Sequence, residues 1–392
     1  MVTESFKQRI QSSLAKADIR IGGARPWDLR VHNEQLYPRV FTQGALGLGE
    51  AYMDGWWECE RLDAFFYRIL DAEVDRGFRI NLRSVWAYLR AYITNMQNSS
   101  RAYDVGREHY DRGNDLYGAM LDDRLVYTGG DWHKANTLSE AQEAKLDRVC
   151  RKLNLRAGQS VLDIGCGWAS FARYAAENYG ANVTGVTISE EQAKLGRKRC
   201  EGLPVEIRLQ DYRRVEGRFD HIVSLGMFEH VGYKNYNSFM QTAYNHLKRD
   251  GLFLLYCIGG NRSVRTSNPW TTKYIFPNSM IPSIRQIGDA IEKLFVMEQW
   301  DNVGCDYDRT LMAWHKNFEE AWPKLKNNYS ERFYRMWKYY LLSSAGGFRS
   351  RRLQLWQIVL SPHGVSGGYI PIPPHDRGGG AGKEPQRSKA TP

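Results

Sequence analysis

From about residue 143 the sequence alternates between helical and strand-like segments, and this alternation constrains the fold more than any other feature. The helical segments are AKLDRVCRKLNL, SFARYAAENYG and SEEQAKLGRKRCEG, and the strand-like segments between and after them are SVLDIG, NVTGVTI, PVEIRLQ and DHIVSLG. Strands that alternate with helices in this way predict a parallel sheet with helices on both faces. We therefore expect an α/β domain.

The first 95 residues have a different pattern. LDAFFYRILDAEVDRGFRINLRSVWAYLRAYI carries apolar residues at spacings of three and four, which is typical of amphipathic helices. Just before and within it, GALGLGEAYMDGWWECERLDAFF brings together glycines and the aromatic residues Trp56, Trp57, Phe65 and Phe66. Core packing is the simpler interpretation of each ring, and lipid contact is the alternative.

These patterns divide the chain into four segments. Residues 1–95 are expected to form a small helical domain, and 96–104 a linker, because MQNSSRAYD loses the apolar periodicity. The α/β domain covers 105–361. The segment 362–392 is rich in Gly and Pro and almost lacks bulky apolar residues after Ile372, so we expect a disordered tail.

Charge and aromatic content narrow the classes of ligand. The chain has 54 Lys and Arg against 44 Asp and Glu, a formal net charge of +10. An excess of this sign suits nucleic acid or the anionic face of a membrane. Aromatic residues make up 13% of the chain, which suits contact with an apolar ligand or lipid, with nucleic-acid stacking as the alternative.

The cysteines and the apolar windows concern compartment and membrane topology. The six cysteines are scattered without a CxxC pair, so we expect neither disulfides nor a metal site, and a reducing cytoplasm. The N-terminal segment has no apolar signal-peptide core, and no window reaches the roughly 18 apolar residues of a spanning helix. Membrane contact is therefore expected to be peripheral, on the inner face.

A glycine-rich turn follows the first strand of the alternating region. In VLDIGCGWAS, residues 161–170, Gly165 and Gly167 let the backbone approach a ligand, and the helix that follows offers unpaired N–H groups. The third glycine of the dinucleotide fingerprint is missing, and the next strand ends without an acidic residue. Thr187 and Gln192 are the polar candidates there, and an ordinary strand–turn–helix corner is the alternative.

SLGMFEHVG, residues 224–232, leads from an apolar strand directly to Glu229 and His230. A strand that has reached the surface would explain both residues. The carboxyl end of a strand in a doubly wound sheet is also where such folds place their sites. We expect His230 to orient Glu229 or to pack beneath it rather than to act as a base.

Several motifs in a fixed order resemble bacterial cyclopropane-fatty-acyl-phospholipid synthases. They are HYDRGNDLYGAMLD, VLDIGCGW, GVTISEEQ, LQDYR, GMFEHVG, KYIFPNSMIPS, DYDRTLMAW, NYSERFYRMW and FRSRRLQLWQ, and GLGEAYMDGWWECERLD extends the match toward the N-terminus. The resemblance covers roughly residues 15 to 360. It implies a Rossmann-like class I methyltransferase domain with a helical lipid-binding domain, and an enzyme that is often dimeric.

The resemblance also implies the reaction and its co-substrate. S-adenosylmethionine would donate a methylene to the cis double bond of an acyl chain in a phospholipid, which forms a cyclopropane ring. Glycines would allow backbone approach, Thr and Gln would bind the ribose hydroxyls and the carboxylate, and a Tyr would contact the adenine. Carried over by motif, the residues expected around the co-substrate are Tyr127, Thr128, Asp163, Gly165, Gly167, Thr187, Gln192, Asp211 and Tyr212.

Such a reaction passes through a carbocation, which must be shielded from water and must lose a proton to a base. In the family the base is taken to be bicarbonate, held by a Cys, the Glu of FEH, a His, a Tyr and the backbone near an Ile. By motif, Glu229, Tyr307 and Ile258 take the roles of that Glu, Tyr and Ile here.

The chain departs from the family pattern at the same site. YTGGDW replaces YSCAYW, so Gly129 stands in place of the Cys and Asp131 in place of an aromatic or similar residue. Tyr256 replaces the His of LHTIG, and Ser344 replaces a further Cys. Two ligands of the anion are thereby lost, so the sequence leaves open whether this chain binds bicarbonate.

The loss of these two ligands is compatible with three interpretations. A protein carboxylate, Asp131 or Glu229, takes the proton; or the anion site survives with the Tyr256 hydroxyl in place of the imidazole; or Asp131 lies on a solvated loop and the enzyme is slow. Without a competent base, the product would be methyl-branched or carry a methylene group.

Two other classes of function compete. A catalytically idle relative that binds membrane or co-substrate is suggested only by the Gly129 and Tyr256 changes. A nucleic-acid methyltransferase would use the basic charge, but the chain has no NPPY-type motif and carries a lipid-like domain. We therefore expect a lipid-modifying enzyme and no nucleic-acid partner.

Overall fold

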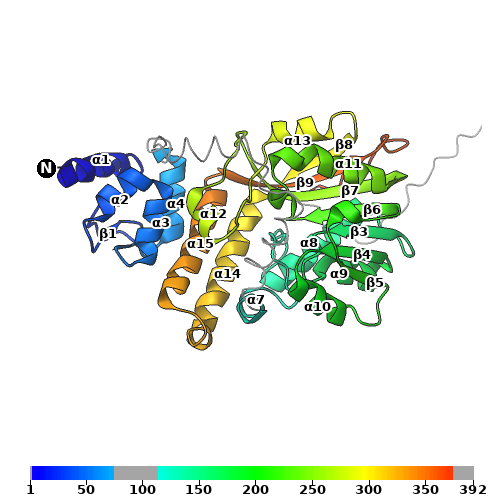
Figure 1. Ribbon diagram of the computed structural model, residues 1–392, viewed down its shortest axis with the longest axis horizontal. Coiled ribbons are helices and arrows are strands. Elements are labelled where there is room, and N and C mark those ends of the chain that lie inside the picture. The colour runs from blue at the N-terminus through cyan, green and yellow to red at the C-terminus, as the bar shows by residue number, and fades with distance from the viewer. Residues whose placement is uncertain (1, 75–113, 374–392) are drawn as a thin grey trace, which may run out of the picture.

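The computed structural model describes residues 2–74 and 114–373 (Figure 1). Within this part of the chain, one seven-stranded sheet has the strand order β5-β4-β3-β6-β7-β9-β8. β3 to β7 run parallel, and β9 pairs antiparallel with both β7 and β8. The strands span Ser160–Ile164 (β3), Asn182–Thr187 (β4), Val205–Leu209 (β5), Phe219–Leu225 (β6), Leu247–Gly260 (β7), Val296–Asn302 (β8) and Leu353–Ser361 (β9).

Helices cover both faces of the sheet, as the sequence alternation predicted. Neighbouring residues of one strand face different layers: Val161 belongs to one apolar core cluster and Leu162 to another. A strand buried on both sides has no polar face, which explains the continuous apolar runs in the sequence. The helices are Leu138–Lys152 (α8), Ser170–Tyr179 (α9), Glu190–Arg199 (α10), Tyr236–His246 (α11), Ile284–Ile291 (α13) and Gly304–Leu325 (α14).

The N-terminal residues form a separate group of helices beside α15, Glu331–Arg349 (Figure 1). This group contains Val2–Lys16 (α1), Leu36–Gln43 (α2), Ala45–Met53 (α3) and Leu62–Asp71 (α4), with a short strand pair of Arg30–Val31 (β1) and Trp57–Glu58 (β2). Trp57, Phe65 and Phe66 are buried in its core, so the core interpretation of these rings is confirmed. Trp56 is half-buried under the guanidinium of Arg39.

Close backbone contact joins these N-terminal helices to the rest of the molecule. A Cβ atom at Gly346 of α15 would lie 2.7 Å from the Cβ atom of Phe66 and 2.7 Å from the backbone nitrogen of Tyr67. Arg349 donates hydrogen bonds to Asp63 of α4 at 2.6 Å and to Asp308 of α14 at 2.9 Å. Helix α4 therefore packs directly against α15 of the α/β domain.

Several expected boundaries fall outside the described residues, namely the linker 96–104, the end of the helical domain after residue 74, and the tail from 374 on. The structure differs from the predicted tail over 362–373. The Val365 N–H donates to Glu298, the Gln299 amide donates to the Ile372 carbonyl, and the Tyr369 hydroxyl donates to the Lys152 carbonyl. Val365 and Tyr369 also pack against the apolar core, so hydrogen bonds and apolar contacts together hold this Gly- and Pro-rich segment in place.

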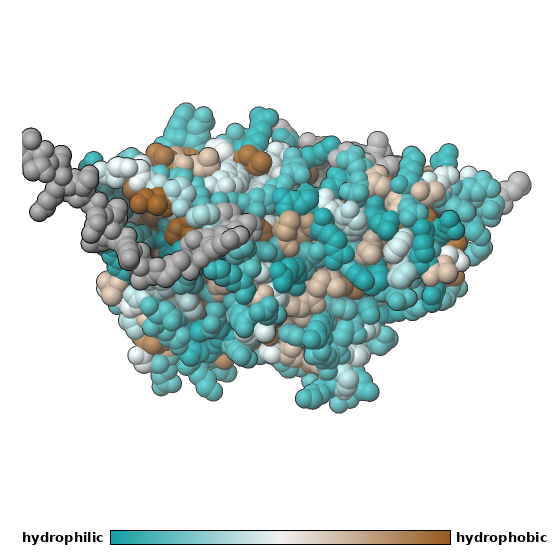
Figure 2. Space-filling model, turned by 180° about the vertical axis from the view of Figure 1, so that it is seen from behind, coloured by the Kyte–Doolittle hydropathy of each residue, from teal (hydrophilic) through white to brown (hydrophobic). Residues whose placement is uncertain are grey.

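Two further short helices are Asn114–Met120 (α7) and Pro269–Tyr274 (α12). Among the described residues, no helix has the length and apolar character needed to cross a membrane. Figure 2 shows one face of the molecule, which is mostly hydrophilic with apolar residues in small separate groups.

Candidate functional site

The glycine turn after β3 adopts a backbone conformation that favours glycine. Gly165 has φ +82° and Gly167 has φ +55°, both in the left-handed region. A Cβ atom at Gly165 would lie 2.6 Å from Cγ of Met227, whereas one at Gly167 would meet nothing within 4 Å. The turn therefore packs tightly on one side and is open on the other, next to the start of α9 at Ser170.

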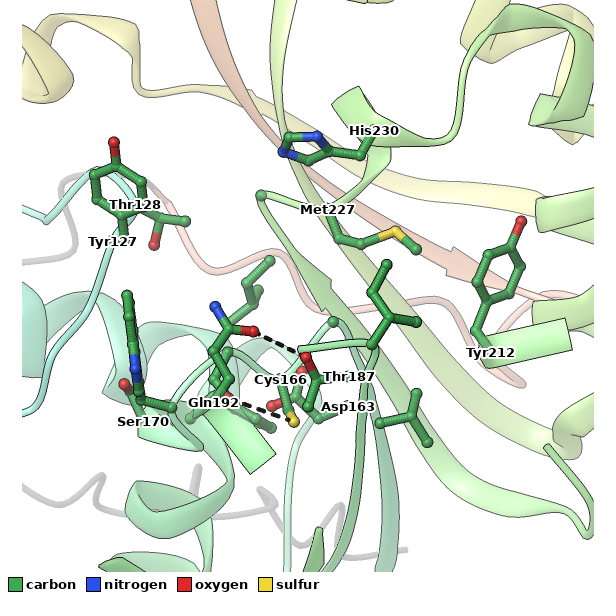
Figure 3. Close-up of a pocket in the computed structure, with 18 of the residues that line it drawn as sticks. Tyr127, Thr128, Asp163, Cys166, Ser170, Thr187, Gln192, Tyr212, Met227 and His230 are labelled. Atoms are coloured by element: carbon green, nitrogen blue, oxygen red, sulfur yellow. Dashed lines mark hydrogen bonds between the residues drawn. The ribbon is translucent and has the colours of Figure 1, made fainter. Parts of the chain in front are cut away.

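A first cavity opens at this turn, beyond the carboxyl ends of β3 and β4 (Figure 3). In Figure 3, Tyr127 and Tyr212 lie on opposite sides of the cavity, and the Thr187 hydroxyl donates to Oε1 of Gln192 at 2.8 Å. The structure brings all nine residues expected around the co-substrate to this cavity: Tyr127, Thr128, Asp163, Gly165, Gly167, Thr187, Gln192, Asp211 and Tyr212.

The first cavity also contains a buried acidic and a buried basic residue, Asp163 and Lys145. The sequence motifs identified Asp163 but not Lys145. Asp163 is buried and its Oδ2 atom has no hydrogen-bond partner among the described residues. Lys145 of α8 is buried as well, and its Nζ donates to Oγ1 of Thr128 at 3.0 Å. Burial raises the pKa of Asp163 to about 7 and lowers the pKa of Lys145 to about 7, and the attraction between the two opposes both shifts.

A signal for Lys145 was present in the sequence. Ala141, Lys145 and Val149 follow one another at a spacing of four on α8, and all three are buried. A lysine on the apolar stripe of a helix contradicts the amphipathic pattern, because a buried ammonium group needs a polar partner. Such a position marks a functional candidate.

A second cavity adjoins the first. Tyr127, Thr128, Gly226 and His230 line both. Most of the remaining lining is apolar or aromatic, and it reaches Leu70 of the N-terminal helix α4. The side chains in this lining include Phe276, Leu311, Tyr340, Phe348, Leu353 and Leu355.

Glu229 is the carboxylate of this second cavity. It lies on a 3-10 turn, Phe228–His230 (η4), which follows β6 after a short connection. Its Oε1 atom accepts a hydrogen bond from the Ile258 N–H at 2.6 Å, and its Oε2 atom has no hydrogen-bond partner among the described residues. Burial raises the pKa of Glu229 to about 7. The adjacent His230 ring lies 5.7 Å from the Phe276 ring, and burial lowers the pKa of His230 to about 4.

The residues that depart from the family pattern contact one another. Tyr256 of β7 donates its hydroxyl to the Gly129 carbonyl at 2.7 Å. A Cβ atom at Gly129 would lie 2.6 Å from Cδ2 of Leu355 and 3.1 Å from both the Tyr256 hydroxyl and Cγ of Tyr307. The space that a side chain at position 129 would need is thus already filled. Tyr256, Ile258, Tyr307 and Ser344 all line the second cavity together with Glu229.

Asp131 lies outside the second cavity, and it is neither a carboxylate at the reacting centre nor a residue on a solvated loop, the two roles expected from the sequence. It is not part of the lining of either cavity, and it is only 6% exposed. Its carboxylate forms an ion pair with the buried Arg148 of α8 and accepts a hydrogen bond from the His133 N–H at 3.1 Å. The sequence could not predict this partner, because Arg148 lies 17 positions away on another element. The side chain neither faces solvent nor reaches the cavities.

Comparison with known proteins shows which family this chain is similar to. Residues 97–358 match the family model of mycolic acid cyclopropane synthetase. The cyclopropane-fatty-acyl-phospholipid synthase of Escherichia coli (strain K12) is 51% identical over 91% of this chain and 93% of the relative. A sphingolipid C9-methyltransferase of Komagataella phaffii is 33% identical over 85% of this chain and 73% of the relative.

Solved structures agree with these sequence matches. A cyclopropane synthase from Mycobacterium tuberculosis has a TM-score of 0.63 at 28% identity, over 68% of this chain and 99% of that chain. A coclaurine N-methyltransferase, at 20% identity and a TM-score of 0.65 over 80% of this chain and 98% of that chain, shares the fold. These likenesses confirm the Rossmann-like class I methyltransferase fold and the resemblance found in the sequence. The chain belongs to the cyclopropane synthase family of S-adenosylmethionine-dependent methyltransferases.

Proposed function

We propose that the protein converts the cis double bond of an unsaturated phospholipid acyl chain into a cyclopropane ring, with S-adenosylmethionine as co-substrate. The observation that carries this proposal is the pair of adjoining cavities with a common wall at Tyr127, Thr128, Gly226 and His230. One cavity is built on a glycine turn with polar groups, and the other is largely apolar with one buried carboxylate. The family and the 51% identical relative support the same reaction.

The polar groups of the first cavity fit S-adenosylmethionine. Asp163 offers a buried carboxylate oxygen that has no hydrogen-bond partner within residues 2–74 and 114–373, and Gly167 leaves open space at the lining. Thr187 and Gln192 bond to each other here and can exchange that bond for ribose hydroxyls or a carboxylate of the ligand. Tyr212 supplies a ring for contact with adenine. S-adenosylmethionine supplies an activated methyl group when bound.

The second cavity suits the acyl chain and the positive charge that forms on it. Its apolar side chains bury a hydrocarbon chain and exclude the water that would quench a carbocation. Tyr127, Phe276, Tyr340 and Phe348 contribute aromatic rings to the lining. Aromatic faces attract a cation, so these rings stabilise the charge without reacting with it.

We also propose that the protein contacts the membrane near the mouth of the second cavity. Val264 and Ile284 are 38% and 55% exposed. The amide of Gln286 donates to the Val264 carbonyl at 3.2 Å, and the hydroxyls of Ser263 and Ser283 lie 2.7 Å apart, which holds this loop against the start of α13. We call Val264 and Ile284 the apolar loop pair.

Charge and position support a bilayer as the partner of the apolar loop pair. Arg262, Arg265 and Arg285 flank the pair and are exposed. Arginines beside exposed aliphatic side chains suit an anionic lipid surface. Ser267 and Asn268, which follow the same loop, line the second cavity. An acyl chain could thus pass from the bilayer to the cavity over a short path.

The proposed reaction is tested with purified full-length protein, S-adenosylmethionine and vesicles of a phospholipid with cis-monounsaturated acyl chains. The expected product is a fatty acid with one additional CH2 and without the double bond. A fatty acid that gains a methyl or methylene branch would indicate a different end of the same reaction. Unaltered fatty acids, with S-adenosylhomocysteine binding intact by calorimetry, would identify an idle relative and contradict the proposal.

A further inference from the structure

Glu229 lines the second cavity, and its two carboxylate oxygens differ in their hydrogen bonds to the protein. The Ile258 N–H holds Oε1 at 2.6 Å, while Oε2 is buried and has no hydrogen-bond partner among the described residues. A buried carboxylate oxygen without a partner is costly, because desolvation of a charged group is repaid only by hydrogen bonds or an opposite charge. The cavity that receives the acyl chain is therefore where this oxygen is expected to find a proton or a cation.

Groups in the second cavity that could bind a second anion have partners in the protein. Arg352, the arginine of the lining, donates to the Leu70 carbonyl at 3.2 Å and lies 4.0 Å from the Glu73 carboxylate. Position 129 has no side chain that could bind an anion, and a Cβ atom there would lie 2.6 Å from Cδ2 of Leu355. The Tyr256 hydroxyl donates to the Gly129 carbonyl, and the Ile258 N–H donates to Glu229 itself. An anion next to the ionised Glu229 in this buried cavity would also be repelled.

Asp131, the other carboxylate considered as the base, is excluded from that role by its position. It is paired with Arg148 and does not line the cavity. Among the described carboxylates, Glu229 is the one in the lining of the second cavity. We propose that Oε2 of Glu229 itself takes the proton released on ring closure, and that the enzyme forms the ring without bound bicarbonate. This inference rests on the proposed function.

The proposed step balances in atoms and charge. The π electrons of the double bond form a bond to the methyl carbon of S-adenosylmethionine while the bond from that carbon to sulfur breaks. Its electron pair stays on sulfur, which leaves as S-adenosylhomocysteine, and a positive charge remains on the other alkene carbon. A C–H bond of the new methyl group then breaks, and its electron pair forms the bond that closes the ring. The proton goes to Oε2 of Glu229, and is passed to water after the product leaves.

The environment of Glu229 is consistent with this role. Burial raises its pKa to about 7, so the carboxylate is a stronger base than an exposed glutamate and is still substantially ionised near neutral pH. The bond from Ile258 fixes the orientation of the group. The neighbouring Tyr256 and Cys257 do not compete as anions, since burial holds the pKa of each well above its usual value.

The test compares ring formation by the wild-type protein in carbonate-free buffer and in the same buffer with added sodium bicarbonate. Initial rates are expected to agree within about twofold. A rate that falls at least about tenfold in carbonate-free buffer and recovers on addition of bicarbonate would overturn the inference. Vesicles whose lipids are not methylated at all would overturn the proposed function, and the inference with it. This comparison needs no variant.

Glu229→Gln supplies the second measurement, because glutamine keeps the shape and can still accept the Ile258 N–H. Removal of a general base typically costs about 10²–10⁴-fold in rate. We expect a loss of this size in ring formation, or diversion to a methyl-branched or methylene product, with unchanged affinity for S-adenosylhomocysteine by calorimetry. Glu292→Gln, an exposed carboxylate just after α13, is the matched control. Ring formation by Glu229→Gln at the wild-type rate would contradict the inference.

Discussion

Asp131→Asn separates a structural role of this carboxylate from a catalytic one. Asp131 and Arg148 are 6% and 5% exposed and form an ion pair. Asparagine can still accept the His133 N–H through its carbonyl oxygen, so the change removes mainly the charge that compensates Arg148. Removal of one partner from a buried ion pair typically destabilises a protein by about 3–5 kcal/mol, because the other charge stays buried without compensation.

The size of the expected thermal shift follows from the length of the chain. For 392 residues, typical values predict an unfolding entropy of about 0.8 kcal/mol/K at the midpoint. A loss of about 3–5 kcal/mol therefore lowers the midpoint by about 4–6 °C. The measurement is thermal unfolding of wild type and variant, followed by circular dichroism at one protein concentration and one scan rate.

The control is the double variant Asp131→Asn with Arg148→Met. Because it removes both charges, its midpoint is expected to lie closer to wild type than that of the single variant. The rate of ring formation per folded molecule is expected to stay near wild type in the single variant, since Asp131 lies outside both cavity linings. A variant with wild-type stability but without ring formation would refute this reasoning.

Three further predictions concern the first cavity, the contact between the helical domain and α15, and the membrane surface. Gly167→Leu should abolish binding of S-adenosylhomocysteine, measured by calorimetry, because the new side chain enters open space at the lining of the first cavity. The control is Gly202→Leu, since Gly202 has φ +80° and equally open space around it. Equal affinities of the two variants would contradict the assignment of the first cavity. Gly346→Ala should lower the free energy of unfolding by about 3 kcal/mol, because the added methyl group overpacks against Phe66. The control is Gly288→Ala, since Gly288 is a helical glycine in open space and should tolerate alanine. Similar thermal unfolding midpoints for the two variants would show that the contact between α15 and α4 is loose. Ile284→Glu should weaken co-sedimentation of the protein with anionic vesicles at least about tenfold, and high salt should weaken the electrostatic part of the binding further. The control is Leu209→Glu, which replaces an exposed aliphatic residue on β5. Unchanged sedimentation of Ile284→Glu would contradict the proposed membrane contact of the apolar loop pair.

The sequence determined the α/β layers and the place of the first cavity. Continuous apolar strands require cover on both faces, and parallel strands bring their carboxyl ends to one edge of the sheet. Gly165 after β3 and Thr187 at the end of β4 therefore lie close together although 22 positions separate them in the chain. The same rule placed Glu229 near the site, after β6. Local patterns carry this information because burial and backbone conformation depend on the segment itself.

The tertiary structure alone decided which side chains pair. Asp131 follows a glycine pair in a polar stretch, which suggests a solvated loop, yet Arg148 of α8 buries it. Tyr256 and Gly129 look like two separate losses in the sequence, whereas the structure shows a single hydrogen-bonded contact between them. Lys145 becomes a member of the first cavity only through the packing of α8 against the sheet. Hydrogen bonds and ion pairs between distant elements depend on distances of a few ångström, and these distances are set by how the layers pack and not by any one segment.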